Sequence, residues 1–369
     1  MSRIFMTGLE TGDAALRMFN GGYDAAELTE TKQRSGDYGI AFLVDHVEGD
    51  NGWARHWIQG LGAVGGSGPT EIFVRAYMRI EPTMDQAVEI LRIKGGASSI
   101  YDILRFDLGG EVWAWYDGTW NDKGGLVSGM DNDDTHHCWE YYIRLNTSDV
   151  YIDGQVIIHR DGVELYNQDN IQICNVADVD EIGVVQFGCA YESSIPDPSS
   201  TGYVYMDDIA INDTLGTRNN SWCGPGAIVA LKPTGDGQYF DWTRTPSENS
   251  GWECVDDIPP DEGTTYVSST EEDDTDTYLF ESLVSKGIGD TSLINAVAWN
   301  ILGKLPAAGE SVLYPMYRFR QVTDAELSEV TLRQTYYHYA QHIEDADPVT
   351  NSAWLPTNIN NSEYGFRQG

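Results

Sequence analysis

GQVIIHRDGVELYN, residues 154–167, predicts two short strands joined by a tight turn. Asp161-Gly162 separates two apolar runs, and a two-residue hairpin turn needs residues that tolerate positive φ. The same period of two extends outward to FVRAYMRI, residues 73–80, where every second residue is aliphatic. No segment of this half of the chain shows a convincing amphipathic helical stripe. The pattern therefore predicts an all-β protein.

Strand-like runs recur along the whole chain, separated by turns rich in Gly, Asn and Asp. YGIAFLV, residues 38–44, is continuously apolar, as expected of a central strand covered on both faces. NDTLGTRNNSWCGPG, residues 212–226, is polar and ends near a proline, which favours a domain boundary. We therefore expect a jelly-roll domain over residues 1–215 and a second β-rich domain over residues 216–369.

Beyond that boundary the strand signals are weaker but continue to the end. Four further strand-like pieces cover residues 277–283, 293–302, 311–320 and 335–343. The composition of AELSEVTLRQ, residues 325–334, is typical of a helix, so a helix is one interpretation of this segment.

The composition excludes several classes of partner. The 369 residues include 22 Lys and Arg against 58 Asp and Glu, a formal net charge of -36. Nucleic-acid binding and docking on an anionic membrane both need a basic surface, so neither is expected. The chain shows neither a signal-peptide pattern nor an apolar run long enough for a membrane helix, so we expect a soluble protein made in a cytosol.

Cysteine usage fits a reducing compartment. The five cysteines are odd in number and have no framework spacing, which favours reduced, mostly buried thiols. A Cys223–Cys254 bridge is the alternative, and its geometry cannot be judged from sequence.

Several blocks together resemble proteins of tailed bacteriophages. The first part resembles concanavalin A-like (laminin G-like) jelly rolls that recur in phage genomes, through SGDYGIAFLV (35–44), CWEYYIRLN (138–146), IDGQVIIHRDGVEL (152–165) and YVYMDDIAINDT (203–214). The second part resembles the partner domain behind that jelly roll, through VALKPTGDGQYFDWT (229–243), CVDDIPPDEGTTYVSS (254–269) and DPVTNSAWLPTNINNSEYGFRQ (347–368). The order of the blocks is more specific than any one of them.

This resemblance implies a fold and a role. The expected fold is an N-terminal jelly roll followed by a C-terminal β-sandwich. The expected role is a non-enzymatic structural component of the virion, capsid-decorating or tail-associated, made in the host bacterial cytoplasm. Its implied partners are other phage structural proteins and further copies of itself, a trimer being one form. A carbohydrate-binding adhesin that contacts a host-surface glycan is the alternative, and a polysaccharide depolymerase is the third hypothesis.

Asp207-Asp208 is the most informative local feature. Adjacent strand residues face opposite sides, so one of the two carboxylates must point at an apolar sheet face. A buried carboxylate is costly unless it is paired or bound to a cation. We expect hydrogen-bonded structural residues paired with Arg75 or Arg79, with a Ca²⁺ site as the alternative. No cofactor is required on either interpretation.

The loop GMDNDDTHHCWE, residues 129–140, is the second place where a cation could bind. Asp131 and Asp133 supply hard oxygen ligands at close spacing, which suits Ca²⁺, although the ligand order of an EF-hand is missing. A solvated turn is the more ordinary interpretation. Zinc on His136-His137-Cys138 is disfavoured because consecutive residues do not converge readily on one tetrahedral ion.

The densest group of aromatic residues lies in EVWAWYDGTW, residues 111–120. Flat aromatic rings stack on sugar C–H faces, so this group is the candidate glycan contact; its members are Trp113, Trp115, Tyr116 and Trp120. Large aromatics also fill sandwich cores, and for Trp113 and Trp115 we favour the core.

Catalytic motifs are absent from the sequence. Jelly-roll glucanases carry a Glu-x-Asp-x(-x)-Glu strand motif, and none occurs here. The nucleophile elbow, the His-Glu-x-x-His motif and the phosphate-binding glycine loop are also missing. From the sequence we therefore expect no enzymatic activity.

Overall fold

The computed structural model confirms the all-β fold class. It describes residues 3–19, 21–22, 26–44, 53–59, 68–82, 88–95, 101–116, 119–126, 130–147, 151–173, 181–190, 202–332 and 334–369. Within these ranges the only α-helix is the short α1 (Pro356–Asn360). No helix in the same ranges is long and apolar enough to cross a membrane.

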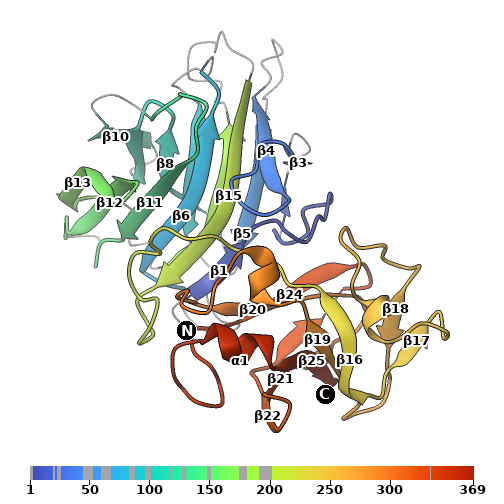
Figure 1. The fold of residues 1–369 in the computed structure, drawn as a ribbon. Helices are drawn as coiled ribbons and strands as arrows, with labels where there is room; N and C mark the ends of the chain where they lie inside the picture. The colour runs from blue at the N-terminus through green and yellow to red at the C-terminus, as the bar shows by residue number, and fades with distance from the viewer. Residues whose placement is uncertain are drawn as a thin grey trace.

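Two large antiparallel sheets form the jelly-roll sandwich (Figure 1). The eight-stranded sheet runs in the order β13 (Val163–Ile171), β12 (Gly154–Arg160), β11 (His137–Arg144), β6 (Glu71–Ile80), β15 (Gly202–Asp213), β4 (Gly39–Val44), β3 (Ala26–Thr29), with β1 (Arg3–Thr7) also paired to β15. The seven-stranded sheet runs in the order β10 (Thr119–Gly125), β9 (Glu111–Tyr116), β8 (Tyr101–Asp107), β7 (Glu89–Gly95), β14 (Ile182–Ala190), β5 (Trp53–Gln59), β2 (Gly21–Gly22). The hairpin predicted at Asp161-Gly162 joins β12 to β13, with both residues at positive φ.

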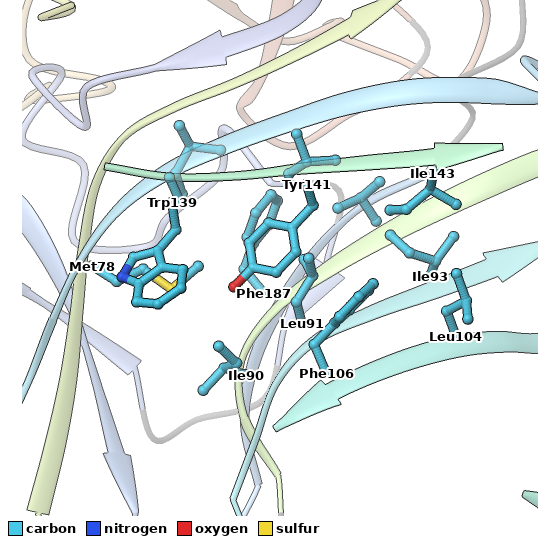
Figure 2. Packing of buried hydrophobic residues seen from close by; sticks show 14 of the residues in the cluster. Met78, Ile90, Leu91, Ile93, Leu104, Phe106, Trp139, Tyr141, Ile143 and Phe187 are labelled. Carbon is cyan, nitrogen blue, oxygen red and sulfur yellow. The ribbon is translucent and has the colours of Figure 1, made fainter. Parts of the chain in front are cut away.

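The core lies between the two sheets. Trp139 and Tyr141 extend from β11 toward Leu91, Phe106 and Phe187 of the opposite sheet (Figure 2). Each of these side chains is at most 2% exposed. Burying an aromatic or aliphatic side chain of this size contributes about 1.5–3 kcal/mol relative to leaving it in water, so this layer carries much of the stability.

β-bulges in β15, β7 and β8 change which residues share a face. In β15 the pairing shifts between Asp207 and Ala210, with Asp208 at positive φ. In β7 the bulge sends both Ile90 and Leu91 into the core. A second shift in the β7–β8 ladder does the same for the consecutive pair Ile103 and Leu104. Each bulge reverses the alternation of the strand beyond it.

The C-terminal part is also built from strands. Its six-stranded sheet contains β16 (Pro233–Phe240), β19 (Thr275–Phe280), β25 (Glu363–Gln368), β21 (Ser311–Phe319), β22 (Thr323–Glu326) and β23 (Val330–Leu332). Two smaller ladders pair β17 (Thr243–Thr245) with β18 (Tyr266–Ser268), and β20 (Val297–Gly303) with β24 (His338–Glu344). Short 3₁₀ turns lie at Trp252–Cys254 and Leu283–Lys286.

The helix suggested for residues 325–334 is wrong. Its first residues belong to β22 and its later ones to β23, and both strands pair with β21. Helical composition is a weak preference, and pairing to a long central strand overrides it. An aromatic cluster fills this part of the protein, with Trp299, Tyr317, Trp354 and Tyr364 packed at ring-centroid distances of 5.4–6.5 Å.

The N-terminal strand connects the two parts. β1 pairs with β15 of the sandwich and also contacts β24 of the C-terminal part. The amide nitrogen of Gln341 donates to the Met6 carbonyl at 2.9 Å, and the Gln341 carbonyl accepts from the Met6 N–H at 3.3 Å. An ion pair of 2.7 Å between Arg17 and Glu262 adds a second link. Figure 1 shows the yellow-to-red C-terminal part lying directly below the sandwich.

Candidate functional site

The outer face of the seven-stranded sheet carries a line of polar side chains. Gln186 of β14 lies opposite Arg92 of β7, Arg92 opposite Arg105 of β8, and Arg105 opposite Trp113 of β9. Directly opposite residues in a ladder share a face, and their neighbours along each strand are core residues. We call these four residues the polar row. With strands about 4.8 Å apart, the row spans about 15 Å.

The β7 and β8 bulges add two carboxylates to the same face. Glu89 and Arg92 are separated by two consecutive core residues, so both face outward. The same holds for Asp102 and Arg105. Arg92 donates to both oxygens of Glu89, at 2.8 and 2.5 Å, and to Asp102 at 3.1 Å. Arg92 and Glu89 are almost fully buried, so this charge-assisted network holds the middle of the face rigid.

Trp113, at the end of the row, and Trp120 of β10 both lie beside Arg105. The guanidinium of Arg105 sits 5.0 Å from the Trp113 ring and 4.6 Å from the Trp120 ring. Arg92 lies 5.4 Å from Trp120 as well. Both indoles are partly exposed to solvent. Cation–π contacts of this kind restrict the orientation of the rings.

The expectation that Trp113 fills the core is therefore wrong. Val112 and Ala114 point inward and are fully buried, and Trp113 points to the outer face between them. Trp120 lies beside Arg105 on the same face. Trp115 pairs with Trp120 in the β9–β10 ladder. The side chains of Trp115 and Tyr116 lie outside the described residues.

Of the titratable groups on this face, Asp107 has the most clearly shifted pKa. Burial raises the pKa of its carboxyl to about 6, and the nearby negative charge of Glu111 adds to that rise. The Glu111 N–H donates to it at 2.9 Å and the Trp113 indole N–H at 3.2 Å, and both hydrogen bonds oppose the rise. A carboxyl with a pKa near neutrality can give or take a proton under physiological conditions.

Gln186 is a second notable group on this face, because part of its hydrogen-bonding capacity is unused. Its side chain is 4% exposed, and its carbonyl oxygen accepts no hydrogen bond from any residue that the structure describes. A buried amide oxygen without a donor costs about 1–3 kcal/mol.

The predicted calcium ligands of β15 have protein partners instead. Asp207 and Asp208 are both fully buried, because the bulge at positions 207–210 turns both away from solvent. Asp207 accepts from the backbone N–H groups of Arg34 and Ser35 at 2.8 and 3.0 Å. Asp208 accepts from the Arg34 guanidinium at 2.7 Å and from the Ile228 N–H at 2.5 Å.

The partners expected for this pair were misassigned. Arg34, from a loop, provides the counter-charge in place of Arg75 or Arg79. Arg75 donates to the backbone carbonyls of Asp208 and Gly224, at 3.0 and 2.9 Å, and Arg79 pairs with Asp134 at 2.7 Å. The assumed alternation also fails here. Ile209 and Ile211 face the core along with Val204 and Met206, because the bulge shifts the register by one.

The carboxylates of the 130–138 loop are held by neighbouring cations. Asp131 pairs with Arg160, and Asp133 accepts from His137 at 3.3 Å and from the Thr135 N–H at 3.0 Å. Over the described ranges, no three His, Cys, Asp or Glu side chains converge as metal ligands. Cys138, Cys223 and Cys254 are free and buried, so the Cys223–Cys254 bridge is not formed.

The comparisons with known proteins return solved structures only. No family model matches the chain, and no curated protein matches it. One similar structure is the endo-β-1,4-glucuronan lyase of Trichoderma reesei, at 12% identity and TM-score 0.42, covering 57% of this chain and 95% of that one. Another is the Chlorella virus alginate lyase vAL-1, at 11% identity and TM-score 0.37, covering 51% and 88%. A third is the family 7 alginate lyase A1-II′, at 10% identity and TM-score 0.37, covering 56% and 99%.

These findings contradict the expectation of a non-enzymatic virion structural protein. The solved structures named are polysaccharide lyases, and their likeness covers 51–57% of this chain. At these identities and TM-scores the likeness concerns the sandwich and carries no substrate or residue role. A place in a phage particle and homo-oligomeric assembly stay predictions. What the chain shares with proteins of known structure is therefore an all-β jelly-roll sandwich.

Proposed function

We propose that this protein is a polysaccharide depolymerase that binds its glycan along the polar row. The observation that carries the proposal is the pair of outward-facing tryptophans, Trp113 and Trp120, fixed by Arg105 beside Asp107. A structural role gives no reason to expose two indoles on a sheet face that also holds a carboxyl titrating near neutrality.

The binding chemistry follows from the shape and lining of the face. A row of about 15 Å is long enough for several sugar rings and suits a polymer better than a single small molecule. The indole faces provide stacking surfaces, and Gln186 provides a hydrogen-bond acceptor for a hydroxyl group. The chain has few basic residues overall, yet Arg92, Lys94 and Arg105 gather on this sheet. These cations can face carboxylated sugars, although Arg92 already pairs with Glu89 and Asp102, and Lys94 with Asp102.

Asp107 is the group we assign to proton transfer. Cleavage of a glycosidic bond by hydrolysis or by β-elimination requires a proton for the departing oxygen. A carboxyl whose pKa is raised to about 6 by burial holds that proton in a useful fraction of molecules at neutral pH. The hydrogen bond from Trp113 ties its position to the platform on which a sugar would stack.

The test is a cleavage assay on a panel of neutral and uronate-containing polysaccharides. Reducing ends report any cleavage, and the ultraviolet absorbance of unsaturated uronates reports β-elimination alone. We expect wild-type protein to release oligosaccharides from at least one polymer. Asp107→Asn should lower the rate by about a hundredfold or more while retaining binding, and Trp113→Ala should weaken binding.

Asp169→Asn is the matched control, because Asp169 is an exposed aspartate on β13 of the other sheet. It should leave cleavage unchanged. Wild-type protein that cleaves none of the panel, or an Asp107→Asn variant that cleaves at the wild-type rate, would refute the assignment.

A further inference from the structure

A polar cavity lies where the N-terminal segment meets the C-terminal part, away from the polar row. Its volume is about 350 Å³, within the range of small-molecule sites. Residues of opposite charge line it: Glu10, Glu30 and Asp37 come from the N-terminal segment, and Lys232 and Lys286 from the C-terminal part. We call it the junction cavity.

The acidic wall is organised around Glu10. Its two carboxylate oxygens accept the backbone N–H groups of Asp37 and Tyr38, at 2.9 and 3.2 Å. Gly36 makes this approach possible: at its φ of +62°, a Cβ atom would overlap the Glu10 carboxylate. Within the described ranges no basic side chain forms an ion pair with Glu10. Burial and the nearby carboxylates of Asp37 and Asp208 raise its pKa to about 7.

The basic wall also has a lysine without an ion-pair partner among the described residues, although the charge of Lys232 lowers the pKa of Glu281 and opposes the rise in the pKa of Asp256. Lys286 pairs with Glu281 at 2.9 Å, and the same carboxylate accepts the backbone N–H of Lys232 at 3.0 Å. The ammonium group of Lys232 has no carboxylate within ion-pair distance in the part of the chain that the structure describes. The two walls thus present an unpaired anion and an unpaired cation to one space.

The two walls contact each other directly beside the cavity, so the cavity is a feature of the packing between them. Gly12, at φ +61°, lies between Tyr38 of one wall and Ile258 of the other, and a Cβ there would come within 3.0 Å of both. The Arg17–Glu262 ion pair links the same two segments. Gln33, also in the cavity lining, has a buried side-chain oxygen that accepts no hydrogen bond among the described residues. Charge and hydrogen-bonding capacity both remain open for an occupant.

We propose that the junction cavity binds a small zwitterion, with the ligand's ammonium group at Glu10 and its carboxylate at Lys232. An amino acid or a short ω-amino acid has this chemistry. A ligand of one charge would compensate one wall and leave the other unpaired, so both charges are needed for tight binding. The Gln33 oxygen would accept an additional N–H from the ammonium group.

Isothermal titration calorimetry with glycine, 4-aminobutyrate and 6-aminohexanoate tests the proposal, since these probes differ in the separation of their two charges. Butylamine and butyrate are the single-charge controls. We expect one of the three zwitterions to bind in a 1:1 ratio at pH 8 and at least about tenfold more tightly than either control, as expected from one added charge-assisted contact. Binding no tighter than the controls for all three would overturn the proposal.

Two variants test whether the ligand binds between the two walls of the cavity. Lys232→Gln should weaken it by about tenfold or more, and Lys304→Gln, which changes a lysine stacked on Tyr337, should not. Glu10→Gln should have a similar effect, and its thermal melting curve shows whether the Gly36 turn has survived. Affinity should also fall as the pH drops below about 7, because Glu10 then takes up a proton. Equal affinity in Lys232→Gln and wild type would refute the assignment. Because none of the residues that line the cavity belongs to the polar row, the cleavage assay succeeds or fails independently of this result.

Discussion

Replacing Arg34 by methionine removes the counter-charge of two buried carboxylates while keeping much of the side chain's volume. The Arg34 guanidinium donates to Asp208 at 2.7 Å and to the Gly226 carbonyl at 2.8 Å, and it stacks 3.8 Å from the Tyr77 ring. Asp208 is fully buried. A hydrogen bond to a charged group is worth about 1.5–3 kcal/mol. The cation–π contact adds about 0.5–1 kcal/mol. We therefore expect the free energy of unfolding to fall by about 2–4 kcal/mol.

The pH dependence of this loss gives the prediction a second test. Burial and the charge of Asp208 raise the pKa of Asp207 from 3.8 to about 7. Between those two values the folded protein holds a proton that the unfolded chain has released. The stability contributed by this group therefore decreases as the pH rises from about 4 to about 7. Without Arg34 the ionised pair is more costly, so Arg34→Met should lose more stability at pH 8 than at pH 6.

Urea unfolding of wild type and variant at both pH values measures the loss. Arg79→Met is the matched control, because Arg79 also pairs with an aspartate, but Asp134 has a side chain that is 38% exposed. Exposed ion pairs contribute about 0–1 kcal/mol, so this control should lose less than about 1 kcal/mol. The reasoning is refuted if the two variants lose the same amount, or if the loss in Arg34→Met is greater at the lower pH.

Three further predictions concern the core, one histidine and the thiols. Trp139→Ala should destabilise the fold by about 3–5 kcal/mol because the indole is fully buried between the sheets, whereas Trp113→Ala should cost much less; thermal and urea unfolding compare them. Hydrogen bonds to Asp161 and Asp133 raise the pKa of His137 against the opposing effect of burial. The stability it contributes should be present below about pH 6.5 and decline as the pH rises through the folded pKa; NMR titration of its ring should show a midpoint above 6.5. Burial raises the pKa of Cys138 and of Cys223 to about 11, so iodoacetamide should modify both far more slowly in folded than in urea-unfolded protein; peptide mass mapping that finds equal labelling would contradict their buried state.

The strand pattern of the sandwich could be predicted well because it rests on short-range physics. Asp161-Gly162 can form a tight turn from its own φ preferences, and the alternation in residues 73–80 matches the fully buried positions of β6. The helix proposed at residues 325–334 failed because the deciding interaction is the pairing of β22 and β23 with β21, which the composition of the segment itself does not reveal.

The candidate site was largely missed because it depends on register between strands. Trp113 and Trp120 could be named from composition, but their side of the sheet could not be decided from residues 111–120 alone. Arg92, Asp107 and Gln186 come from three strands that meet only in the folded sheet. One signal was available: the apolar pairs Ile90-Leu91 and Ile103-Leu104, each flanked by charged residues, break the alternation as a bulge does. Arg34 lacked even such a signal, since it comes from a loop 173 residues away from Asp207.

The bulges of β7 and β8 determine how this surface can arise or be lost during evolution. Each adds one inward residue between two outward ones, so Glu89 and Arg92 share a face at an odd separation. Deleting Ile90 would leave Glu89, Leu91 and Arg92 in regular alternation, with both charged residues still on the outer face. Deleting one residue at an unbulged position of the same strands would instead turn every residue on one side of the deletion to the opposite face and exchange a polar surface for an apolar one. Sequence alignments of related chains should therefore place single-residue gaps in these strands at Ile90 and Ile103, and chains that lack both extra residues should keep the paired arginines and carboxylates on this face.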